Sequence, residues 1–233
     1  MSLQVAVLGA GGYVGRGVVR ALRERGEVTE VTRDTFQDAR RGSYDVLVNA
    51  AMPAARFRAS QDPLWDFEET VRKTADLLAG WEAGKLVQVS SISARTQRDT
   101  VYGRHKAAAE ALCRPDRDLV VRLGPMYSPD LEKGVLVDLL AGRKVWVDAS
   151  SRYGFAPRDW VAGWIAAHLD RAGVVEVGGR GAIALGDLAA RIGADSELEG
   201  AVDHQEFDGP PEWPAAEEVV AFLEARRRAG VVA

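Results

Sequence analysis

A tyrosine and a lysine four residues apart have the spacing best suited to acid–base chemistry in this sequence. Tyr102 and Lys106 lie in the run T-V-Y-G-R-H-K, which leads into an alanine-rich, helix-like stretch. Positions i and i+4 project from the same face of a helix. A cation beside a phenol favours the phenolate, so the pair could exchange a proton closer to neutral pH than a free tyrosine, whose pKa is about 10. The same spacing is common on surface helices, so the catalytic interpretation depends on residues upstream.

A glycine-rich turn follows the first apolar run of the chain, residues 3–8. After the turn, apolar residues recur at helical spacing, and residues 27–33 alternate as a second strand would. Glycines between the strand and the helix of a βαβ unit let backbone N–H groups approach a pyrophosphate. We therefore expect a dinucleotide-binding turn. Its binding residues would be Gly9, Gly12, Tyr13, Val14 and Gly15.

The cofactor preference is predicted by Arg33, at the end of the second expected strand. An acidic residue at this point binds the ribose 2′-hydroxyl of NAD, whereas a cation suits the 2′-phosphate of NADP. NADP(H) is therefore favoured over NAD(H); the alternative is that Arg33 is a solvated loop residue beside Asp34. The strand expected at 44–51 ends in Ala50 and Ala51, whose small side chains would leave room for the cofactor.

Strands and helices alternate through the first part of the chain, which predicts an α/β fold built on a Rossmann-type doubly wound parallel sheet. We expect an NAD(P)-binding domain at 1–128 and a small C-terminal substrate-binding region at 129–233, with strands that interleave in one compact unit. Further strands are expected at 85–89, 118–123, 144–147 and 174–177. Helices are expected at 63–81, 134–140, 158–169, 184–192 and 215–228.

Composition narrows the classes of partner. The net charge of −4 and a pI near 5.5 argue against nucleic acid. The single cysteine, Cys113, and three dispersed histidines predict neither an intramolecular disulfide nor a metal site. No apolar run approaches the ~20 residues that span a bilayer, and no leader pattern precedes the first strand. We therefore expect a cytoplasmic, metal-free protein without membrane association.

Four local motifs together resemble the short-chain dehydrogenase/reductase superfamily, most closely its extended, NAD-dependent epimerase/dehydratase family. They are V-L-G-A-G-G-Y-V-G at 7–15, D-V-L-V-N-A-A at 45–51, V-S-S-I-S at 89–93 and V-Y-G-R-H-K-A-A-A-E at 101–110. The resemblance implies that Tyr102 is the general acid/base. It also implies that Lys106 lowers the pKa of Tyr102 and holds the nicotinamide ribose, and that Ser91 binds the substrate oxygen, with Ser93 as the less favoured choice. Thr70 stands where that family often has asparagine.

The resemblance implies an NAD(P)(H)-dependent oxidoreductase with a Ser-Tyr-Lys catalytic set. The favoured activity is NADPH-dependent reduction of a small polar ketone or of a sugar or sugar-nucleotide ketone. One alternative is an NAD-dependent sugar-nucleotide epimerase that keeps its cofactor bound. Another is a non-catalytic NAD(P)-binding sensor module. The expected partner is a small-molecule substrate, and a homodimer is an open alternative because self-association is common in this family.

Overall fold

The computed structural model describes residues 3–230, which divide into two compact units. Residues 3–123 and 159–176 form the first unit, and residues 124–158 and 177–230 form the second. The chain therefore leaves the first unit after its fifth strand, forms part of the second, and returns to add one more helix and strand. All the site residues predicted from the sequence belong to the first unit.

The first unit is built on a six-stranded sheet with the order β2-β1-β3-β4-β5-β9. From β2 to β5 each neighbouring pair is parallel. The chain moves outward from β1 in one direction to β2 and in the other to β3, so the strand order reverses there. The Rossmann-type fold is thereby confirmed. The strands are β1 (Gln4–Leu8), β2 (Glu27–Val31), β3 (Ser43–Asn49), β4 (Glu82–Ser91), β5 (Leu119–Leu123) and β9 (Gly173–Val177).

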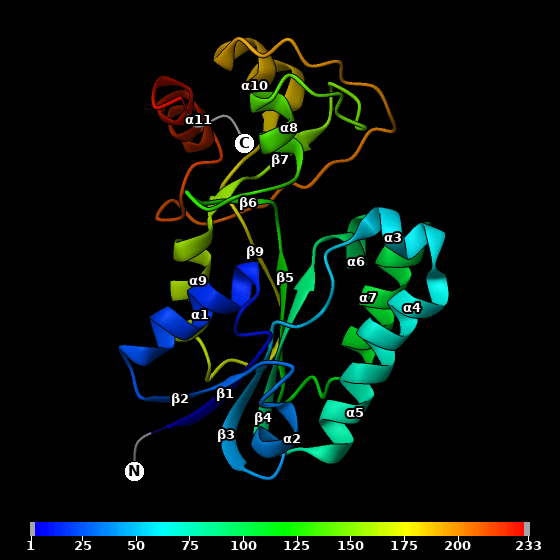
Figure 1. The fold of residues 1–233 in the computed structure, drawn as a ribbon, viewed down its shortest axis with the longest axis vertical. Coiled ribbons are helices and arrows are strands. Elements are labelled where there is room, and N and C mark those ends of the chain that lie inside the picture. Colours follow the sequence, from blue (N-terminus) through cyan, green and yellow to red (C-terminus); the bar gives the residue numbers. More distant parts are fainter. Residues whose placement is uncertain (1–2, 231–233) are drawn as a thin grey trace. The chain divides into compact units, whose positions relative to one another are not determined.

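Helices cover both faces of this sheet. Figure 1 shows α1 (Tyr13–Arg23) and α9 (Arg158–Ala167) on one face, and α5 (Lys73–Gly80) and α7 (Val101–Ala111) on the other. Strands covered on both faces need apolar side chains in both directions, which is why they read as continuous apolar runs rather than alternating ones. In β1, for example, every residue after Gln4 is buried.

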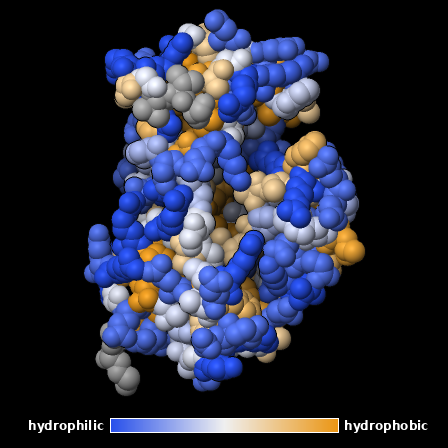
Figure 2. Space-filling view, viewed as in Figure 1, coloured by the Kyte–Doolittle hydropathy of each residue, from blue (hydrophilic) through white to orange (hydrophobic). Residues whose placement is uncertain are grey.

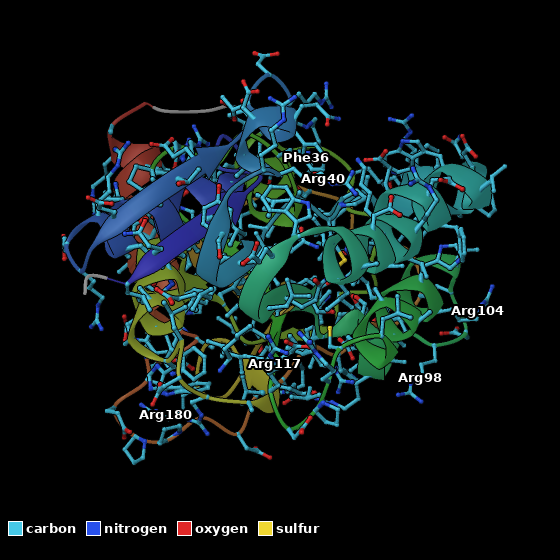
Figure 3. All side chains as sticks on the ribbon, turned by 90° about the horizontal axis from the view of Figure 1, so that it is seen from below. Phe36, Arg40, Arg98, Arg104, Arg117 and Arg180 are labelled. Carbon is cyan, nitrogen blue, oxygen red and sulfur yellow. The ribbon has the colours of Figure 1, made fainter. Side chains whose placement is uncertain are left out.

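A short helix, α2 (Phe36–Ala39), packs against the end of α5, where Trp81 is the capping residue. The Phe36 ring meets the Trp81 ring edge-on, with centroids 5.4 Å apart. Arg40, directly after the helix, donates from Nε to the backbone carbonyl of Gly80 at 3.2 Å. Figure 3 labels both Phe36 and Arg40 on this short element.

The helix predicted at 63–81 is present, but it is not regular. It consists of α4 (Pro63–Phe67), a π-helical turn η1 (Glu68–Arg72) and α5. Asp62 caps its start by accepting a hydrogen bond from the Trp65 N–H at 3.0 Å. Single π-helical turns inside α-helices are frequent at functional sites.

Exposed apolar side chains lie on α4 and on the helix before it, α3 (Arg56–Gln61). Phe57 is 75% exposed and Leu64 is 70% exposed. Figure 2 shows hydrophobic surface in this part of the molecule. Exposed apolar residues are normal on protein surfaces when they are scattered. These side chains do not by themselves identify a subunit interface, so the homodimer stays a prediction.

The second unit has two short ladders in place of a large sheet. Strands β6 (Met126–Tyr127) and β8 (Ala156–Pro157) pair in parallel, and β7 (Arg152–Tyr153) and β10 (Ile183–Ala184) pair antiparallel. Its core is closed by α8 (Val135–Leu140), α10 (Leu185–Ile192) and α11 (Glu218–Arg228). The prediction of a strand at 144–147 is wrong, because Val145 forms only an isolated bridge to Leu198. The facing segment is irregular, so the apolar alternation finds no strand to pair with.

Within residues 3–230, no helix is both long enough and apolar enough to cross a membrane. The same residues contain no cluster of histidine, cysteine and acidic side chains that could hold a metal ion.

Candidate active site

The glycine turn lies where the strand order reverses, between the ends of β1 and β3. Gly9 has a φ of +73°, and a Cβ there would lie 2.8 Å from the carbonyl oxygen of Ala50. A Cβ on Gly15 would lie only 2.0 Å from the carbonyl oxygen of Gly9. Both glycines are therefore required for the turn, the strand end and the helix to approach one another. Ligands of open α/β sheets bind at such switch points.

The N-terminus of α1 is suited to an anion. Gly12 caps the helix without a side chain, and its N–H bonds back to the carbonyl of Gly9 at 2.8 Å. The first turn, which begins with Tyr13 and Val14, contains no acidic residue. The first N–H groups of a helix have no acceptor within the helix, and the helix dipole adds positive potential. This turn fits the pyrophosphate of a dinucleotide.

The other predicted cofactor residues lie along the same edge of the sheet. Gly9 N–H donates to the carbonyl of Val31 at 3.0 Å, which holds the end of β2 beside the glycine turn. Arg33 follows two residues later and is exposed. Ala50 bonds through its N–H to the carbonyl of Leu8 at 3.0 Å. Ala51 follows it and is exposed, so both alanines lie beside the glycine turn.

Ser91, which ends β4, and Ser93, which begins α6, lie near Tyr102 because Gly103 has no side chain. A Cβ on Gly103 would lie 2.0 Å from the carbonyl oxygen of Gln97 and 2.7 Å from that of Ser93. Without a side chain there, α6 (Ser93–Thr96) packs directly on the first turn of α7. Ser91 Oγ donates to Ser93 Oγ at 3.2 Å. The absence of a side chain at Gly103 therefore allows Ser91 and Ser93 to lie close to Tyr102.

Tyr102 is a buried phenol with a raised pKa. Burial raises the pKa, and it outweighs the opposing effects of the Arg56 charge and of a hydrogen bond to the side chain of Ser91. Negative charge on Asp66 adds to the rise. The sequence analysis expected Lys106 to lower the pKa of Tyr102; the cation that lowers it is Arg56, and the net shift is upward. Burial in this site therefore favours the protonated phenol over the phenolate.

Lys106 is buried on the same face of α7. Its Nζ lies 5.1 Å from the centroid of the Tyr102 ring and donates to the backbone carbonyl of Pro53 at 2.9 Å. Burial lowers its pKa to about 7, although the charges of Asp66 and Glu110 act to raise it. The Lys106 ammonium can therefore gain or lose a proton near neutral pH. A buried ionisable group whose pKa is shifted toward neutrality is a candidate for a functional role.

Three further residues contribute to the site, and the sequence analysis assigned none of them to it. Arg56 donates from a terminal nitrogen to Ser93 Oγ at 3.0 Å, and its guanidinium carbon lies 5.9 Å from the Tyr102 ring centroid. Asp66 Oδ2 lies 2.8 Å from His105 Nδ1. No spacing rule connects residues 56 and 66 to α7, since folding alone brings them there. His105 could have been considered from the sequence, because it directly precedes Lys106.

Two arginines near Tyr102 in sequence do not enter the site. Arg98 donates to the carbonyl of Ala94 at 3.0 Å, and Arg104 donates to that of Asp99 at 2.8 Å. Both side chains are exposed, and Figure 3 shows them on the outside of the molecule. They hold the loop between α6 and α7.

The opposite end of α7 carries a fully paired charge network. Glu110 receives two hydrogen bonds at 3.0 Å from Arg122 Nε and one at 2.6 Å from Arg122 Nη2. Ser90 donates to Glu110 at 2.6 Å. Glu176 then links Arg122, at 3.3 Å, to Arg95, at 2.7 Å. The network joins β4, β5, β9 and α7 below the site.

No family model matches the sequence, and no curated protein matches it.

Solved structures do match this fold over nearly its whole length. dTDP-4-dehydrorhamnose reductase from Bacillus anthracis, in complex with NADP, is 15% identical with a TM-score of 0.75, over 97% of this chain and 99% of that one. UDP-N-acetylglucosamine 4-epimerase from Methanobrevibacter ruminantium is 15% identical with a TM-score of 0.74, over 96% of both chains. The Bordetella bronchiseptica enzyme WbmF, in complex with NAD⁺, is 18% identical with a TM-score of 0.66, over 98% of both chains.

These matches confirm the fold that the resemblance to extended short-chain dehydrogenases/reductases implied. The named neighbours include a reductase and an epimerase of nucleotide-linked sugars, and they contain NADP in one case and NAD⁺ in another. At this level of identity, the likeness speaks for the fold and leaves the reaction to be argued from the site.

Proposed function

We propose that this chain is an NADPH-dependent reductase that converts a small polar ketone, or the ketone of a sugar or sugar nucleotide, into an alcohol. The observation that carries the proposal is the buried phenol of Tyr102 beside the Ser91 hydroxyl. Reduction of a carbonyl needs a proton for the oxygen, and a phenol kept in its acid form can supply it. A second donor on the same oxygen stabilises the negative charge that develops there.

Each residue then has a defined role in the proposed reaction. Ser91 donates a hydrogen bond to the carbonyl oxygen, and Tyr102 transfers its proton to that oxygen. Lys106 holds the ribose hydroxyls nearest the reacting carbon and supplies positive charge to the phenolate that remains. The nicotinamide cofactor, when bound, supplies the hydride. The glycine turn and the N-terminus of α1 hold the pyrophosphate.

The cofactor preference rests on Arg33. Its side chain is exposed two residues after the end of β2, close to the glycine turn. The first turn of α1 contains no acidic residue that would repel a phosphate. A guanidinium can bind a phosphate through two parallel hydrogen bonds. We therefore expect NADPH to bind more tightly than NADH.

Calorimetric titration of the purified protein with NADPH and NADH tests the cofactor assignment. We expect tighter binding of NADPH by about tenfold or more, and loss of that preference in Arg33→Asp. Arg25→Asp, which changes another exposed arginine after α1, is the matched control and should keep the preference. Equal binding of the two cofactors would contradict the role of Arg33, and binding of neither would remove the reductase proposal.

An epimerase is the second candidate, because the structural neighbours include 4-epimerases of nucleotide-linked sugars. An epimerase takes a hydride from its substrate and returns it to the same molecule, so it retains its nucleotide. Nucleotide absorbance in the purified protein, released on denaturation and identified as NAD, would favour this candidate over the reductase.

A further inference from the structure

The carboxylate of Asp66 is completely buried and only half satisfied. Its Oδ2 accepts from His105 Nδ1 at 2.8 Å, and the side chain has no exposed surface. Its Oδ1 is buried and has no hydrogen-bond partner among residues 3–230. The hydroxyl of Thr70, four residues along the same irregular helix, is likewise buried without a partner in the described part of the chain. Native proteins rarely leave such atoms unpaired, so each calls for an explanation.

The helix that carries Asp66 packs on the part of α7 that contains Lys106. His105, which Asp66 contacts, directly precedes Lys106, and both α4 and η1 lie against α7. The Lys106 ammonium is itself buried, and its hydrogen bond goes to a neutral carbonyl group, that of Pro53. A buried ammonium without a nearby negative charge is costly and releases its proton.

Two carboxylates act on Lys106, and only one of them is held by a permanent cation. Glu110 is bound by three hydrogen bonds from Arg122 and one from Ser90, so its charge is largely compensated. Asp66 has only His105, which is charged only when doubly protonated. The charged groups near the pair Tyr102 and Lys106 are thus Asp66 on α4, Glu110 on α7 itself and Arg56 on α3.

We propose that Asp66 is the counter-ion of Lys106, a positioning residue that keeps the lysine charged so that it can serve the tyrosine and the ribose. His105 holds the carboxylate in place through Oδ2, and Oδ1 stays buried without a hydrogen-bond partner among residues 3–230. The role in turnover rests on the proposed function, but the effect on the charge of Lys106 does not. It is a property of the folded chain without any ligand.

The direction of the expected effect follows from the sign of the charge. Lys106, with a pKa of about 7, is charged below neutral pH and loses its proton as the pH rises. Asn at position 66 has nearly the same volume as Asp but no charge, so Lys106 should release its proton at still lower pH. An opposite charge nearby typically shifts a pKa by one unit or more, so we expect the midpoint to fall by about one pH unit.

NMR titration of the ligand-free protein, labelled isotopically in lysine, measures this directly. The chain has five lysines, and the signal of Lys106 is the one that disappears in Lys106→Met. We expect a lower midpoint in Asp66→Asn and recovery toward the wild-type value in Asp66→Glu. Asp76→Asn, on the exposed side of α5, is the matched control and should leave the midpoint unchanged. An unchanged midpoint in folded Asp66→Asn would overturn the proposal.

If Asp66→Asn does not fold, the Lys106 titration of His105→Gln tests the proposal instead. This variant retains the carboxylate, so the Lys106 midpoint should stay at or above the wild-type value. A fall would show that His105, and not Asp66, sustains the charge. NADPH affinity measured against pH then separates the two proposals. If the midpoint shifts but no nicotinamide cofactor binds, the charge assignment stands and the reductase fails.

Discussion

The two ends of α7 handle buried charge in opposite ways. At the C-terminal end, Glu110 and Arg122 satisfy each other through several hydrogen bonds, and Ser90 completes the set. Toward the N-terminal end, one turn before Glu110, Lys106 bonds to a carbonyl group, and Asp66 of the neighbouring helix α4 keeps one oxygen without a partner in the described residues. Both ends are buried within one helix, so burial alone does not explain the difference.

The difference separates structural from functional polar groups. Removing one partner of a buried, fully hydrogen-bonded ion pair strongly destabilises the fold. While the pair is intact, its donors and acceptors are all used, so it cannot bind a ligand. A buried cation with spare donors costs stability, and proteins retain such groups mainly where a ligand or a reaction uses them. The comparison therefore supports a structural role for Glu110, and it supports the catalytic role that we propose for the turn that contains Tyr102.

The largest expected effect is on turnover at the unsatisfied end. Tyr102→Phe removes one hydroxyl and keeps the ring, so NADPH binding should be nearly unchanged. Loss of the proton donor should reduce turnover by roughly 10²- to 10⁴-fold. The rate is measured as carbonyl-dependent oxidation of NADPH. Tyr44→Phe is the control, because the Tyr44 hydroxyl donates to the backbone carbonyl of Ala39 and not to a residue of the candidate site. Retained turnover in Tyr102→Phe would remove the tyrosine from the mechanism.

The next effect is on stability at the paired end. Glu110→Gln leaves the partly buried Arg122 without its main carboxylate, so the free energy of unfolding should fall by about 3 kcal/mol. The exposed pair of Glu68 and Arg72 lies on the same face of the sheet as α7, and Glu68→Gln should cost less than about 0.5 kcal/mol. Urea unfolding of both variants measures the contrast. Equal losses would mean that the Glu110 network adds no more than a surface pair.

The smallest effect concerns the geometry that joins the serines to the tyrosine. Gly103→Ala places a methyl group against the carbonyl of Gln97, so α6 must move and the unfolding free energy should fall by about 1–2 kcal/mol. A Cβ on Gly163 in α9 would meet nothing within 4 Å, so Gly163→Ala should be neutral or stabilising by up to about 1 kcal/mol. Thermal unfolding compares the two. A stable Gly103→Ala would show that α6 and α7 tolerate a wider gap.

Local spacing predicted the glycine turn, the Tyr102 and Lys106 pair and the parallel sheet because each depends on residues close together in sequence. Asp66 and Arg56 could not be assigned from the sequence, since their role arises only when a helix earlier in the chain packs on α7. The expected strand at 144–147 failed for a related reason. Its alternating pattern was present, but a strand also needs a partner, and the facing segment at 197–201 is irregular.

The return of the chain to the sheet sets the order in which the protein can mature during synthesis. Strand β5 is buried and apolar in the finished sheet, but its neighbour β9 lies beyond residues 124–172. Until that intervening segment has left the ribosome, β5 is an unpaired sheet edge of the kind that recruits other chains. A chain truncated after Leu123 should therefore aggregate, although it contains every residue of the candidate active site.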